Sequence, residues 1–174
     1  MNVSLELKTG SWTLLVGPRG LNPGLLEVIA RLGERSGLRI LDGGNRFNAY
    51  TVARAAHGDP DILARITVSR AFTCYQVLSL LESTPALHLP FVVLDMLNTF
   101  YDESVRLRER RHILNACLAH LERLSQAAAG VVSAHPSKVP TLETVALFDQ
   151  LQASAGEVYT LQPAEMPPPP LRLF

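Results

Sequence analysis

The sequence predicts an α/β fold: a three-layer sandwich in which a mostly parallel sheet carries helices on both faces. Short, almost continuously apolar runs recur along the chain, and nearly all of them precede a segment with apolar residues at helical spacing. Such runs are typical of strands buried on both faces, and their alternation with helices is typical of parallel sheets. At 174 residues and 47% apolar content, the chain is long enough for one domain with a well-buried core.

Six strands are expected, and each except the last is followed by a helix candidate. The strands cover residues 12–16, 38–41, 65–68, 91–94, 130–133 and 157–161. The first helix begins at Pro23, because Asn22 is a good N-cap and proline fits the first helical position. The longest helix lies within residues 103–127, where leucines recur at helical spacing, and a further helix covers residues 141–153.

The chain divides into a core domain at residues 1–163 and a proline-rich tail at residues 164–174. The four prolines at 167–170 favour an extended polyproline arm, because proline fits neither a strand ladder nor a helix interior. Such an arm could present Leu171, Leu173 and Phe174 to a groove or sheet edge on a partner. A disordered end is the alternative interpretation.

Composition narrows the class of protein. The formal net charge is zero, so any contact with nucleic acid has to come from a local patch. No apolar run has the length of a signal peptide core or a membrane span, which predicts a cytoplasmic protein without membrane contact. Cys74 and Cys117 are the only cysteines and form no C-x-x-C motif, so neither a disulfide framework nor a metal site is expected.

The segment GPRGLNPGLL at residues 17–26 has the layout of a phosphate loop between a strand and a helix. A phosphate loop reads G-x-x-x-x-G-K-[ST], and counting from Gly17 places Asn22, Pro23 and Gly24 at its last three positions. The lysine and the hydroxyl are therefore both missing. This arrangement suggests that a nucleotide-hydrolase fold serves another purpose here.

Three further segments follow in a fixed order: ILDGGNRF at residues 40–47, SRAFTCYQ at 69–76 and FVVLDMLNTFY at 91–101. Together with the first segment they resemble the RecA-like recombinase ATPases, in particular the RadA and eukaryotic recombinase branch with its non-catalytic paralogues. The resemblance covers residues 14–135. It implies the core fold of the phosphate-loop NTPases.

The resemblance also implies that most catalytic groups are lost. The loop lysine falls at Pro23, the magnesium-binding hydroxyl at Gly24, and the catalytic glutamate at Gly44, two residues after Asp42. The Walker B aspartate is retained as Asp95. The polar residue that senses the γ-phosphate falls near His135.

A vestigial nucleotide site is therefore expected, without catalytic residues and without a dedicated metal site. Its residues are Gly17, Arg19, Gly20, Asn22, Gly24 and Asp95. Losing the lysine removes about 1.5 to 3 kcal/mol of binding, and losing a general base removes about 10²- to 10⁴-fold in rate. No ATP turnover is expected, and binding of ATP with magnesium should be weak. Two alternatives remain: Arg19 could replace the lysine, and Asp95 could merely cap a turn.

A basic cluster follows the fourth segment, where the resemblance places the first DNA-contacting loop of recombinases. Its members are Arg106, Arg108, Arg110 and Arg111, with His112 beside them. Arginines two residues apart point to different sides of a helix, so the cluster cannot form a single face. Contact with the phosphate backbone of DNA and a solvated helix start are both open interpretations.

These observations predict a catalytically degenerate RecA-like protein that acts through a protein partner or a homo-oligomer, as an accessory or scaffold factor in DNA recombination or repair. Two alternatives remain open: a nucleotide-binding switch with a nonstandard loop, and a DNA-binding module that uses the arginine cluster.

Overall fold

The structure is a computed structural model that describes residues 6–57, 59 and 61–162. Its centre is a six-stranded sheet in the order β3-β2-β4-β5-β1-β6, and all neighbouring strands run parallel. The predicted fold class is therefore confirmed. The tail residues Leu171, Leu173 and Phe174, and the four prolines before them, lie outside the described part of the chain.

The observed strands lie close to the predicted ranges. They are β1 (Trp12–Val16), β2 (Leu38–Asp42), β3 (Ile66–Arg70), β4 (Phe91–Leu94), β5 (Gly130–Ala134) and β6 (Glu157–Thr160). The start of β3 is one residue later than predicted, because Arg65 ends a short helix and its Nε donates to the carbonyl of Gly33 at 2.9 Å.

The helices join successive strands. They are α1 (Pro23–Arg35), α2 (Ala49–Ala55), α3 (Ile62–Arg65), α4 (Cys74–Ser83), α5 (Leu107–Ser125) and α6 (Leu142–Ser154), with a 3₁₀ turn η1 (Asn98–Tyr101) after β4. Side-chain caps fix several starts, as the sequence chemistry requires. Thr73 accepts from the Gln76 N–H at α4, and Thr141 forms a capping box with Thr144 at α6.

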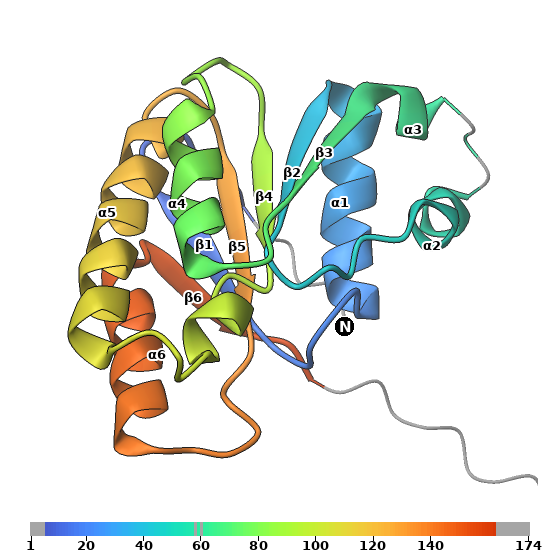
Figure 1. Ribbon diagram of the computed structural model, residues 1–174. Helices are drawn as coiled ribbons and strands as arrows, with labels where there is room; N and C mark the ends of the chain where they lie inside the picture. Colours follow the sequence, from blue (N-terminus) through green and yellow to red (C-terminus); the bar gives the residue numbers. More distant parts are fainter. Residues whose placement is uncertain (1–5, 58, 60, 163–174) are drawn as a thin grey trace, which may run out of the picture.

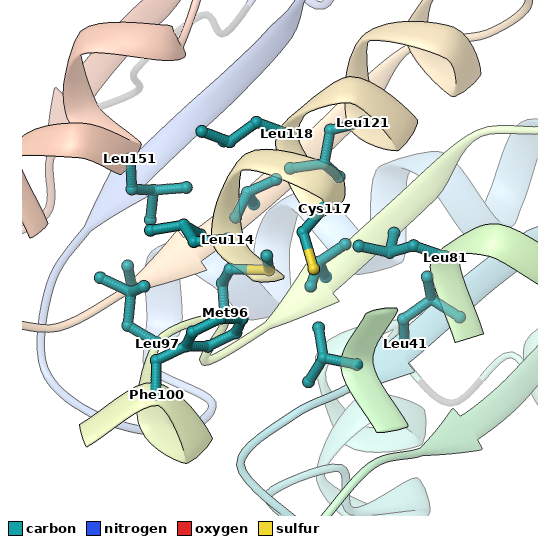
Figure 2. Close-up of a cluster of buried hydrophobic side chains, with 14 of the residues drawn as sticks. Leu41, Leu81, Met96, Leu97, Phe100, Leu114, Cys117, Leu118, Leu121 and Leu151 are labelled. Atoms are coloured by element: carbon teal, nitrogen blue, oxygen red, sulfur yellow. The ribbon is translucent and has the colours of Figure 1, made fainter. Parts of the chain in front are cut away.

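Figure 1 shows α1, α2 and α3 on one face of the sheet and α4, α5 and α6 on the other. Each face has its own apolar core. The larger one packs α4, α5 and α6 against the sheet and η1; Figure 2 shows Leu114, Cys117 and Leu121 of α5 within it, beside Met96 and Phe100. Both faces of β4 are covered, and all four of its residues are buried. The segment that begins at Asp95 directly after β4 is therefore anchored by a buried strand.

No helix in the described part of the chain is both long and apolar enough to cross a membrane.

Candidate functional site

The candidate site lies where the parallel strands end, at the carboxyl edge of the sheet. Residues 17–24 connect the end of β1 to the start of α1, and the segments after β2, β4 and β5 meet at the same edge. The Gly17 N–H donates to the carbonyl of Ala134 at 3.1 Å, which ties the loop to the end of β5. In parallel sheets, ligands bind preferentially at this edge.

The N-terminus of α1 is capped by the chain itself. The Asn22 side chain accepts from the Leu25 N–H at 3.0 Å, and the Asn22 carbonyl accepts from the Leu26 N–H at 3.0 Å. Pro23 at the first helical position has no N–H to offer. A helix N-terminus binds phosphate through its free N–H groups, so few of those donors remain here.

Asp95 takes up a further donor of the loop. Its carboxylate accepts from the Gly20 N–H, with distances of 3.1 Å to Oδ2 and 3.3 Å to Oδ1. The Asp95 N–H in turn donates to Ser133 Oγ at 2.9 Å, and the side chain is only 2% exposed. Asp95 has a φ of 49° and Gly20 a φ of 90°, values that aspartate tolerates and glycine favours.

Burial raises the pKa of Asp95, while the Gly20 N–H and the nearby side chains of His135 and Arg19 act in the opposite direction. Asp42 lies close enough to raise it slightly further. The bond between Gly20 and Asp95 thus holds a desolvated carboxylate against the loop.

Asp42 and Gly44 occupy the strand end where the resemblance places acidic groups. The Asp42 carboxylate is fully buried and accepts from the backbone N–H groups of Gly44, Arg46 and Phe47 at 2.8 to 3.1 Å, so it stabilises the turn after β2. Gly44 packs directly on Asp95: a Cβ at position 44 would lie 2.5 Å from Asp95 Oδ2. The position of the lost glutamate therefore has no room for any side chain.

Leu161, just after β6, covers the loop from the other side. Its N–H donates to the Val16 carbonyl at 2.7 Å. Its side chain lies against two loop glycines: a Cβ at Gly17 would be 3.0 Å from Leu161 Cβ, and one at Gly24 would be 2.9 Å from Leu161 Cδ2. A leucine side chain thus lies over the start of α1.

The two remaining candidates differ in exposure. Arg19 is exposed and forms no ion pair with any described residue. His135 is 9% exposed, and its carbonyl accepts from the Tyr101 hydroxyl at 2.8 Å, with the two rings in edge contact. Burial raises the pKa of Tyr101, so this hydroxyl stays a donor.

The predicted nucleotide-site residues do come together, but the arrangement does not fit a nucleotide phosphate with magnesium. The donors of Gly20 and Leu25 are engaged within the chain, Pro23 has none, and no loop lysine or hydroxyl is present. Nor does the described part of the chain hold three or more His, Cys, Asp or Glu side chains grouped to bind a metal.

The predicted DNA-contacting cluster divides at the start of α5. Arg106, Arg108 and Arg111 are exposed, whereas Arg110 is 1% exposed. Arg110 Nη1 donates to the Phe100 carbonyl at 3.0 Å and Nη2 pairs with Glu143 of α6. The prediction is corrected at this residue, because a guanidinium engaged on both sides inside the fold cannot reach a DNA backbone.

Two contributors to the site were not singled out from the sequence. Ser133 contacts Asp95 because β5 lies beside β4, and Leu161 contacts the loop because β6 lies beside β1. The sequence places both residues at the end of an expected strand, and this position indicates the carboxyl edge of the sheet.

Comparison with known proteins supports the fold. The sequence matches no protein-family profile and no curated protein. Among solved structures, the crystal structure of the RadB recombinase matches with a TM-score of 0.61 and 16% sequence identity, over 88% of this chain and 75% of that chain. The core is therefore RecA-like in its fold.

Proposed function

We propose that this chain is a RecA-like protein without ATP turnover that acts through protein contacts in DNA recombination or repair. The observation that carries this proposal is the bond from the Gly20 N–H to the Asp95 carboxylate, which uses a backbone donor of the loop within the chain. The fold shared with a recombinase supports the process, and the internally bonded loop supports a role other than hydrolysis.

The first test is turnover. The full chain incubated with magnesium and ATP should release phosphate no faster than the Asp95→Ala variant, because the groups that position the phosphate and activate water are missing. Magnesium-dependent turnover that Asp95→Ala abolishes would refute the proposal. Tight nucleotide binding without turnover would favour the switch instead.

The mode of action is a separate part of the proposal. We infer that the tail residues Leu171, Leu173 and Phe174 bind a protein partner or a second copy of the chain. Analytical sedimentation gives the mass of the species formed by the full chain and by a chain that ends at Glu165. The full chain should form the larger oligomer. The same oligomeric state for both chains, together with equal partner binding, would show that the tail does not mediate association.

DNA binding is the second candidate, and the exposure of Arg106, Arg108 and Arg111 favours it. None of the three forms an ion pair within the described residues. Arg108 and Arg111 are three residues apart, so they lie on the same side of α5.

The double variant Arg108→Gln, Arg111→Gln should weaken DNA binding and reduce the slope of log affinity against log salt by about 1 for each lost phosphate contact. The measurement is a mobility shift with a labelled oligonucleotide at several salt concentrations. Arg31→Gln is the matched control, because Arg31 lies on α1 across the sheet and pairs with Glu27 (Figure 1). Binding that is insensitive to salt, or equally weakened by the control, would exclude this surface.

A further inference from the structure

A cavity of about 330 Å³ opens at the carboxyl edge of the sheet, beside the loop that precedes α1. Four segments surround it: Arg19 follows β1, residues 43–46 follow β2, Phe72 follows β3, and Asn98 follows β4. Its size falls within the range of small-molecule sites. The carboxyl ends of parallel strands are also where ligands gather in open α/β sheets.

The charged side chains that line this cavity are both positive. Arg19 and Arg46 are the charged residues that line it, and neither pairs with an acid in the described part of the chain. The buried carboxylates of Asp42 and Asp95 accept from backbone N–H groups, and Asp42 also pairs with Arg70 at 3.5 Å. Both guanidinium groups are therefore available to an outside anion.

Arg46 is held in place by the turn that carries it. Its backbone N–H donates to both Asp42 oxygens, at 2.9 and 3.1 Å. Its side-chain stem lies over Gly20, because a Cβ built there would be 3.7 Å from Arg46 Cδ. This contact places Arg46 beside Arg19, the neighbour of Gly20. Two arginines from different loops thus line one opening.

The rest of the lining suits an organic ligand. Asn45 and Asn98 also line the cavity, and a side-chain amide can donate to a bound oxygen. Phe72 is 64% exposed at the rim, although its backbone is fixed by a 2.8 Å bond from its N–H to Gln76 Oε1. An exposed ring on a fixed backbone can pack against the uncharged part of a ligand.

We propose that this cavity binds a small organic molecule through an oxyanion, a phosphate or a carboxylate, held by Arg19 and Arg46. Arginine forks match both oxyanions by paired hydrogen bonds. The site differs from the loop cradle described above, because it uses the side chains of Arg19 and Arg46 and none of the backbone donors of the cradle. It goes beyond the proposed function, which requires no ligand.

The test measures thermal unfolding of the full chain in sodium phosphate and in sodium malonate, each against sodium chloride at equal ionic strength. The oxyanion should raise Tm in a saturable way, as expected when a ligand binds only the folded state. Arg19→Gln and Arg46→Gln should each weaken the apparent affinity at least about tenfold, the effect of losing a charge-assisted bond. Arg46→Lys should retain part of the affinity, and Arg31→Gln all of it.

Saturation by phosphate alone or by malonate alone identifies the preferred oxyanion, and either result supports the site. Equal Tm in all three salts would overturn it, and so would an oxyanion effect that survives in both glutamine variants. Tm values in chloride report whether the variants fold. Turnover of magnesium ATP would contradict the proposed function, yet it would leave this site standing if the phosphate effect still required Arg46.

Discussion

Replacing Gly44 with glutamate, the residue that the recombinase resemblance places there, is expected to unfold the protein more readily instead of restoring a catalytic acid. A Cβ at this position would lie 2.5 Å from Asp95 Oδ2 and 2.6 Å from Asp95 Cβ. Overpacking of this kind costs about 1 to 3 kcal/mol, and a second carboxylate beside a buried one adds to that cost. Urea unfolding should show the lower free energy of unfolding of this variant.

Gly44→Ala separates the steric cost from the charge. It should cost about 1 to 3 kcal/mol. Asp95→Gly removes the atoms that the new Cβ would meet, and glycine suits the positive φ of residue 95. The double variant Gly44→Ala, Asp95→Gly should therefore be more stable than the sum of the single changes predicts, by about 0.5 to 3 kcal/mol. Strict additivity would show that residues 44 and 95 do not touch.

Arg110→Ala is expected to destabilise the protein by about 2 to 5 kcal/mol, the usual cost of truncating a large buried side chain to alanine. Arg110 joins three parts of the fold: α5 that carries it, the Phe100 carbonyl of η1, and Glu143 of α6. Since η1 follows Asp95 closely, the loss should also loosen the candidate site.

Arg108→Ala is the matched control on the same helix. Its side chain is exposed, so the change should alter stability by less than about 0.5 kcal/mol. Arg110→Met preserves much of the buried volume and should cost less than alanine. Equal stability of Arg110→Ala and Arg108→Ala in urea unfolding would contradict the buried position of Arg110.

The fold could be predicted from the sequence because its signals are local. Apolar strand runs and the Asn22 and Pro23 helix start act within a few residues, and the observed strands lie close to the predicted ranges. The hydrogen bonds within the site could not be predicted in the same way. Gly20 and Asp95 are 75 residues apart, so only the order of strands in the sheet brings them together.

The burial of Arg110 is indicated by its position on the helix but not by its residue type. It lies four residues before Leu114 and seven before Cys117, on the buried side of α5. Arginine is rarely buried without a partner, and its partner Glu143 is 33 residues away. The residue type therefore predicts a solvent-exposed side chain for Arg110, whereas its position on the helix predicts a buried one, and the side chain is buried.

The loop before α1 uses its Gly20 and Leu25 N–H groups within the chain, and so leaves no complete cradle for a nucleotide phosphate. The most direct measurement follows the backbone amide signals of Gly20 and Leu25 by nuclear magnetic resonance while magnesium ATP is added to the full chain. Both signals should stay in place, because the Asp95 carboxylate and the Asn22 side chain already accept from these N–H groups. A saturable shift of both signals would show that phosphate displaces these acceptors, and would contradict the claim.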